Sequence, residues 1–150
     1  MKIINGYKDL INELKEGKCN CIILKDRDVI RFNLPGVKTL MTLLKEDPDF
    51  MKDSFIFDKI LGKGAAALMA LGEVSGIYAE LISEHALSFL KKRDIKINYG
   101  KIVPFIENKT KNGYCPIELV SLLYEDPQII YEQIKNLTGT NNKIRSRVYH

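Results

Sequence analysis

The sequence contains no tryptophan and only three cysteines, Cys19, Cys21 and Cys115. An odd number of cysteines that includes a close Cys-x-Cys pair argues against a disulfide framework. Without tryptophan, any aromatic surface must come from tyrosine and phenylalanine, which are scattered at the spacings of core residues. The chain therefore gives no indication of an aromatic platform for stacking nucleic-acid bases.

Long apolar runs are also lacking. The longest apolar stretch with little charge, Gly64–Gly72, has about half the length that a membrane-spanning helix needs. The first six residues are too short and too polar to form the apolar part of a signal peptide. We therefore expect a protein of the cytoplasm, where thiols stay reduced, with no membrane partner.

Charge of one sign is not in large excess. With 23 basic and 19 acidic side chains the formal net charge is +4, too small to indicate a nucleic-acid partner. The clearest bias is at the C-terminus, where three basic residues between 143 and 147 have no acid nearby. We expect one domain over residues 1–139 and a flexible basic tail over 140–150.

Hydrophobic periodicity predicts an alternation of helices and strands. A helical face at 7–14 precedes two strands at 19–25 and 29–32, which form a hairpin. The remaining predicted elements are a helix from Pro35-Gly36 to Asp47, a strand at 55–60, a helix at 65–71, a strand at 77–82, a helix capped by Ser83, a strand at 95–99, an extended segment at 102–106 bent by Pro104, a helix at 116–124, and a helix from 127 to Gly139. This order predicts an α/β protein with helices on both faces of a mixed sheet.

The turn from Asp58 to Gly64 is the first candidate site. Here a strand leads into a glycine-flanked turn that opens an apolar helix. The first amides of a helix have no partners and attract anions, and Lys63 would add a positive charge. Gly62 and Gly64 would let a ligand approach the backbone. The alternative is a tight turn with a solvated lysine.

A second candidate lies where Cys115 precedes Pro116, the predicted first residue of a helix. The helix dipole would favour a thiolate at this position, and Glu118 follows one turn later. A nucleophilic cysteine also needs a base, for which His85 is the internal histidine available. The alternatives are a binding role and a small thiol that fills the cap position.

Ser83, Glu84 and His85 form a third candidate at the start of a helix that follows a strand. In α/β proteins ligands bind at this end of the strands. The plainer interpretation is a helix cap with a favourable acid and a surface histidine.

No metal or cofactor is expected. Cys19 and Cys21 fall in a predicted strand, where alternate residues share a face. Two further ligands at suitable spacing are not apparent, so both are interpreted as core residues.

Four stretches together resemble a family of bacterial and archaeal proteins known as the domain of unknown function 1893. The resemblance runs from the first helix to about Leu137, and its stretches are Asp58–Met69, Tyr78–Leu87, Val103–Ile106 and Gly113–Glu118. That family is similar in fold to cytidine deaminases, which implies a three-layer α/β/α sandwich.

Zinc deaminases carry a His-or-Cys-x-Glu motif on one helix and Pro-Cys-x-x-Cys on the next. The corresponding helix starts here read Gly62-Lys63-Gly64-Ala65 and Ser83-Glu84-His85-Ala86. Neither supplies the metal ligands or the proton-transferring glutamate, so the resemblance implies the fold without the reaction.

The resemblance further implies that the two helix starts meet at one pocket, lined or bordered by Asp58, Lys63, Ser83, Glu84, Cys115 and Glu118. The first hypothesis is a protein that binds a small anionic or nucleotide-like metabolite. The second is a metal-free enzyme that uses Cys115 as nucleophile or Lys63 as an imine-forming amine. The third is a regulatory or scaffold protein without chemistry. Self-association stays open, with the extended segment near Pro104 as one place for strand pairing.

Overall fold

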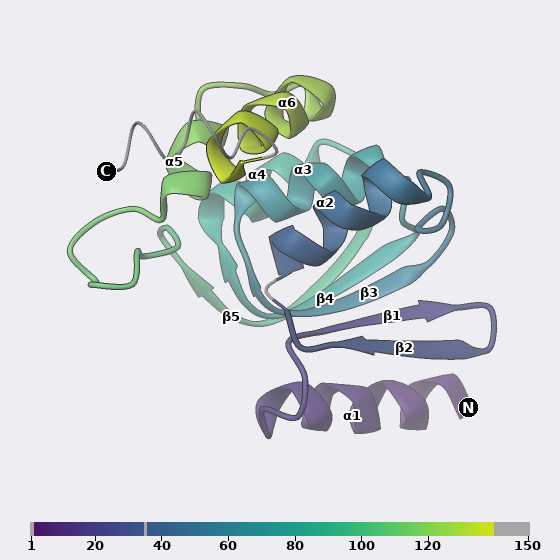
Figure 1. The fold of residues 1–150 in the computed structure, drawn as a ribbon. Helices are drawn as coiled ribbons and strands as arrows, with labels where there is room; N and C mark the ends of the chain where they lie inside the picture. The colour runs from purple at the N-terminus through teal and green to yellow at the C-terminus, as the bar shows by residue number, and fades with distance from the viewer. Residues whose placement is uncertain (1, 35, 140–150) are drawn as a thin grey trace.

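The computed structural model describes residues 2–34 and 36–139, so the basic tail predicted for 140–150 lies outside the described residues. A five-stranded mixed sheet runs through the molecule in the order β2-β1-β3-β4-β5 (Figure 1). The strands are β1 (Cys21–Lys25), β2 (Asp28–Phe32), β3 (Phe55–Leu61), β4 (Gly76–Ser83) and β5 (Lys96–Val103).

The predicted hairpin is present: β1 and β2 pair antiparallel, with Lys25 opposite Asp28 and Cys21 opposite Phe32. On its other side β1 pairs antiparallel with β3. The β3–β4 and β4–β5 pairs are parallel. Because their connections must cross over, a helix lies between each parallel pair.

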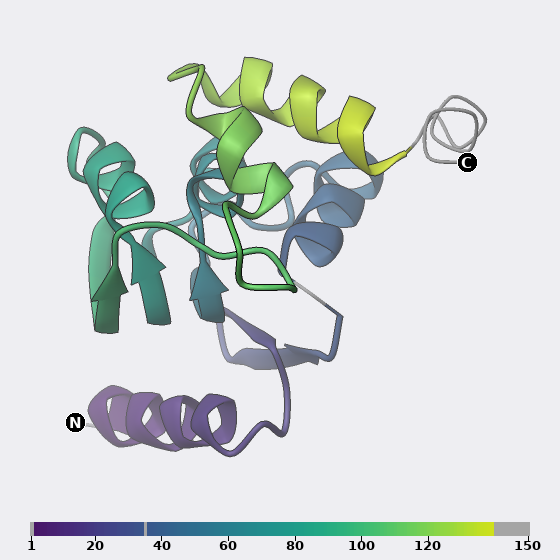
Figure 2. The same cartoon turned by 90° about the vertical axis from the view of Figure 1, so that its left-hand side faces the viewer.

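Helices cover both faces of the sheet, as the alternation predicts (Figures 1 and 2). On one face lie α2 (Gly36–Glu46), α3 (Lys63–Leu71) and α4 (Glu84–Lys91), which bury the larger core. Helix α1 (Lys2–Lys15) covers the opposite face, where Leu10 and Leu14 pack with Phe57 and Tyr78. Two further helices, α5 (Pro116–Ser121) and α6 (Pro127–Thr138), lie over α3 on its outer side.

Helix α3 is the central helix. Residues Lys63 to Met69 are all buried. The sheet lies on one side of α3, and helices α5 and α6 lie on its other side. Ile130 and Ile134 of α6 are fully buried in the same core. This burial on every side explains why the sequence of α3 is apolar all round.

Two predictions about strands need correction. The segments expected at 95–99 and 102–106 form one strand, β5, which continues through Gly100 and ends at Val103, before Pro104. Proline lacks the amide hydrogen that the ladder needs, so it follows the strand and does not bend it.

None of the described helices is long and apolar enough to cross a membrane.

The second correction concerns the Cys-x-Cys pair. Strand β1 begins at Cys21, so Cys19 precedes the strand and the two thiols do not share a face. Cys21 packs in the core under α2 to α4, whereas Cys19 packs in the core under α1. Both are buried, as expected, and burial raises the pKa of the Cys21 thiol above its ordinary value.

Candidate functional site

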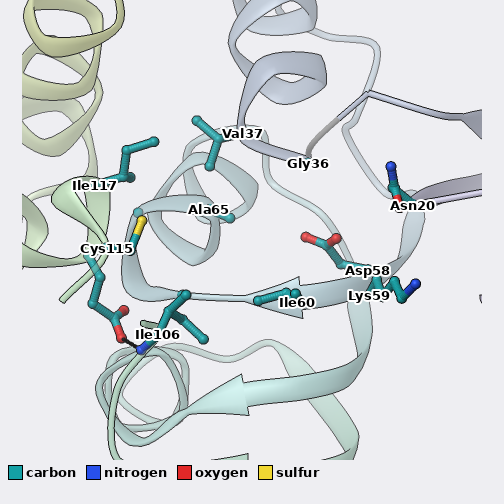
Figure 3. Close-up of a pocket in the computed structure, with 13 residues that line it drawn as sticks. Asn20, Gly36, Val37, Asp58, Lys59, Ile60, Ala65, Ile106, Cys115 and Ile117 are labelled. Atoms are coloured by element: carbon teal, nitrogen blue, oxygen red, sulfur yellow. Dashed lines mark hydrogen bonds between the residues drawn. The ribbon is translucent and has the colours of Figure 1, made fainter. Parts of the chain in front are cut away.

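A cavity of about 350 Å³ opens between the end of β3, the starts of α2 and α3, and the segment that enters α5 (Figure 3). This is the end of the parallel strands at which α/β proteins place their ligands. Its lining residues are Asn20, Gly36, Val37, Asp58, Lys59, Ile60, Gly62, Gly64, Ala65, Ile106, Cys115, Ile117 and Glu118.

Asp58 brings a carboxyl group into this apolar hollow. It lies in β3 between Cys21 of β1 and Ala79 of β4, and only 2% of its surface is exposed. Its Oδ2 atom has no hydrogen-bond partner. Burial raises the pKa of Asp58 to about 7, against the opposing effect of backbone hydrogen bonds from Lys59 and Ile60.

Gly36 makes room for this carboxyl group. A Cβ atom at Gly36 would lie 2.7 Å from Asp58 Oδ2, closer than real contacts allow. The start of α2 therefore closes over Asp58 with backbone alone, and only glycine fits there.

Ile60 forms an exposed apolar floor next to Asp58 (Figure 3). Strand β3 is central, between β1 and β4, yet Ile60 is 50% exposed. Apolar side chains in central strands of a mixed sheet are normally covered on both faces. This cavity therefore combines an uncovered isoleucine with an unpartnered carboxyl group.

Glu118 is the second buried carboxyl group of the cavity, and it is fully partnered. Its Oε1 accepts hydrogen bonds from the Lys63 amide at 2.7 Å and from the Ser83 hydroxyl at 3.1 Å. Its Oε2 accepts from the Ile106 amide at 2.7 Å. The Ser83 hydroxyl in turn accepts from the Ala86 amide and so caps α4. One side chain of α5 thus joins the starts of α3 and α4, which the sequence analysis expected to meet.

The glycine-flanked turn is occupied by the protein itself. A Cβ atom at Gly62 would lie 2.9 Å from Glu118 Oε1, and one at Gly64 would lie 2.5 Å from the side chain of Ile117. The glycines therefore admit α5, whereas the sequence analysis assigned the space to a ligand. The amide expected to attract an external anion instead binds the carboxylate of Glu118.

The side chain of Lys63 also leaves the cavity. It is 6% exposed, and its Nζ lies 2.6 Å from Glu125 Oε2. Hydrogen bonding to Lys63 lowers the pKa of Glu125, and Lys92 lies on the same carboxylate. Lys63 does not line the cavity, and its amine faces an acid, whereas an imine-forming amine must be neutral and face its substrate.

Of the other residues predicted for the site, Cys115 lines the cavity, whereas Ser83 and Glu84 do not. Cys115 lines the cavity at the N-cap of α5, so the structure places it with Asp58, Gly62, Gly64 and Glu118. Ser83 is buried behind Glu118, and Glu84 is exposed at the start of α4. His85, expected as a base for Cys115, has its Nε2 3.3 Å from the hydroxyl of Tyr114.

No ligand-binding role was expected for Ile60, Asn20 or the wall residues Val37, Ile106 and Ile117, although Ile60 lies within the candidate turn from Asp58 to Gly64. One pattern pointed to the floor of the cavity: alternation along β3 puts Asp58 on the same face as Ile56 and Ile60. A carboxyl group on the core face of a central strand is costly, which makes it a candidate functional residue.

Among the side chains that line the cavity, two are acidic and one is basic. Asp58 and Glu118 are the acids, and Lys59 is the basic residue among them. The Lys59 ammonium lies close to Gly17, beyond the end of α1, and is directed away from the Asp58 carboxyl in Figure 3. The expectation of an anionic ligand is therefore not met by the geometry, because no cation is aimed into the cavity by its lining residues.

Within residues 2–34 and 36–139, no group of three or more His, Cys, Asp or Glu side chains could hold a metal ion.

No curated protein matches the chain. Among solved structures, the chain is similar to a DUF1893 family protein from Thermotoga maritima, with a TM-score of 0.78 and 23% identity. The match covers 88% of this chain and 89% of that one, and at this identity it supports the fold alone. The model of the domain of unknown function DUF1893 matches residues 9–138, and the chain therefore belongs to the DUF1893 family.

Proposed function

We propose that this protein binds a small organic molecule in the cavity at the end of β3, with Asp58 as the hydrogen-bonding anchor and Ile60 as the apolar floor. The observation that carries the proposal is the free Oδ2 of Asp58, buried at the cavity wall. A buried polar atom without a partner costs free energy, which a ligand that donates a hydrogen bond would recover.

The dimensions and lining support this proposal. A cavity of about 350 Å³ lies at the lower end of the range for small-molecule sites. Such sites are mainly apolar with a few oriented polar groups, and here Val37, Ala65 and Ile117 accompany Asp58. The ligand that fits is compact, has an apolar body and carries a hydrogen-bond donor, so the nucleotide-like metabolite of the sequence analysis is revised to a molecule without phosphate.

A fragment screen with isotope-labelled protein tests the proposal. We expect binders whose chemical-shift changes centre on Ile60, Ala65 and Cys115, and which slow the alkylation of Cys115 by iodoacetamide. Ile60→Trp should fill the cavity and abolish these effects.

Two matched variants control this experiment. Ile102→Trp makes the same change at a comparably exposed isoleucine of β5 that does not line the cavity. Lys63→Met removes a charge that the sequence analysis assigned to the ligand. Both should retain binding; a screen without binders, or binders indifferent to Ile60→Trp, would contradict the proposed function.

The other functional hypotheses stay predictions. Cys115 lies on the cavity wall, but the contact of His85 is to Tyr114 and gives no support to a Cys–His pair. The similarity to the cytidine deaminase fold, the cytoplasmic location and self-association likewise stay predictions.

A further inference from the structure

We infer that the occupant of this cavity is a planar organic cation of the amidine or guanidine type, whose N–H edge pairs with the carboxylate of Asp58. This inference rests on the proposed function and specifies the chemical class of its ligand.

Asp58 has hydrogen-bonding capacity that the protein leaves unused. A carboxylate has about four acceptor positions on its two oxygens. The neighbouring backbone amides of Lys59 and Ile60 lower the pKa of the group only in part, and Oδ2 is buried without a hydrogen-bond partner. The acceptor positions that remain suit a forked pair of N–H donors, as in the bidentate pairing of a guanidinium with a carboxylate.

The charges around the cavity favour a cation. Glu118 contributes a second carboxylate, while the basic residue of the lining, Lys59, has its ammonium beside Gly17. A cation would therefore find Asp58 without an internal competitor. An anion would face two carboxylates with no cation aimed at it.

The apolar walls of the cavity favour a flat ligand. Ile60 lies beside Asp58 on β3, and the apolar residues Val37, Ala65, Ile106 and Ile117 also line the cavity (Figure 3). A flat conjugated cation can cover Ile60 with its apolar face and direct its N–H edge toward Asp58 in the cavity wall. A compact ammonium would leave the apolar floor uncovered.

Proton linkage follows from the position of Asp58. Because the pKa of the buried carboxyl group is raised to about 7, the empty cavity holds a proton on Asp58 at acidic pH. A cationic ligand needs the carboxylate, so its binding releases this proton and strengthens as pH rises. Above pH 7 the gain should level off, since the carboxyl group is then already ionised.

Three probes of one shape test the inference: benzamidine is a cation, benzamide a neutral donor and benzoate an anion. For fragments of this size we expect dissociation constants of roughly 1 mM. At pH 8, titrations followed by chemical shifts should give benzamidine at least a tenfold higher affinity than benzamide, with benzoate weakest. Benzamidine affinity should fall several-fold between pH 8 and pH 5.5, while that of benzamide should stay constant or rise.

Asp58→Asn keeps the size of the side chain and removes its charge. It should abolish the preference for benzamidine, whereas Lys63→Met should leave the preference intact. If Asp58→Asn does not fold, the pH dependence of the wild-type protein tests the same point.

Equal or tighter binding of benzamide or benzoate, or a benzamidine affinity independent of pH, would overturn the inference. If none of the three binds but the fragment screen finds other occupants, the inference fails and the proposed function stands. If the screen also finds none, both fail.

Discussion

Asp58 and Glu118 are two acids on one cavity with opposite environments. Three donors surround the carboxylate of Glu118, from the starts of α3 and α4 and from Ile106. Asp58 is equally buried, but its Oδ2 has no partner. The comparison separates a carboxylate that holds the fold together from one that the fold stabilises poorly, and poorly stabilised groups of this kind concentrate at binding sites.

Removing Glu118 should have the largest effect. Glu118→Ala leaves two amides and a hydroxyl buried without their acceptor, and each unsatisfied group costs about 1–3 kcal/mol. We expect a loss of about 5 kcal/mol in the free energy of unfolding, measured in urea at pH 7. The control Glu84→Ala removes an exposed acid from the first turn of α4 and should cost about 0.5 kcal/mol. Similar losses in both variants would contradict the role assigned to Glu118.

Asp58 should show the opposite behaviour and make the protein less stable as pH rises. Its pKa is raised from 3.8 to about 7, so between these values the folded state holds a proton that the unfolded chain has released. The contribution of Asp58 is therefore complete below about pH 4 and is lost as pH rises to 7.

Asp58→Asn should remove this pH dependence. At about 1.4 kcal/mol per pKa unit, the variant should gain roughly 2–4 kcal/mol over the wild type between pH 4 and pH 8. Urea unfolding across this range measures the gain. A constant difference between the two proteins at every pH would show that Asp58 does not titrate as described.

The ion pair of Lys63 and Glu125 extends the comparison to a buried cation. The Lys63 side chain is 6% exposed and that of Glu125 is 57% exposed. Glu125→Gln leaves a buried ammonium with a weaker partner and should cost about 2 kcal/mol, whereas Lys63→Met removes the buried charge and should change stability by less than about 1 kcal/mol. Thermal unfolding at constant pH measures both, and a larger loss for Lys63→Met would reverse the assignment.

The smallest effect concerns the thiols. Cys19 and Cys21 are buried and Cys115 is partly exposed at the cavity wall, so mass spectrometry of native protein treated with iodoacetamide should show one adduct. In urea all three should react. Cys115→Ser should change stability by less than about 0.5 kcal/mol and give no native adduct. Rapid reaction of that variant would mean that one of the two core thiols is accessible.

Much of the fold could be predicted from the sequence because its pattern is local. Alternation and turn residues predict the hairpin, and apolar residues around the whole circumference predict the buried α3. Strand β5 was divided in the prediction because Gly100 and its polar neighbours interrupt the hydrophobic alternation, while pairing with β4 keeps the backbone extended.

The site was predicted only in part, because its properties depend on long-range contacts. Gly62 and Gly64 look the same in sequence whether a ligand or α5 fills the space beside them. Likewise, the sequence does not distinguish a lysine that faces a ligand from Lys63, which faces Glu125 of a distant loop. Ile60 is exposed because no described segment of the chain packs over it, and no local pattern in the sequence predicts this.

The long reach of Glu118 has a consequence for the order in which the molecule assembles. It joins α5 to Lys63, which is 55 residues earlier in the chain, and to Ser83, 35 residues earlier. Contacts between such distant residues form late, because closing long loops costs entropy before the contact is made. A chain that emerges from the ribosome can therefore pair β3, β4 and β5 before the cavity exists, and the last wall of the cavity closes only after residue 118 has been synthesised.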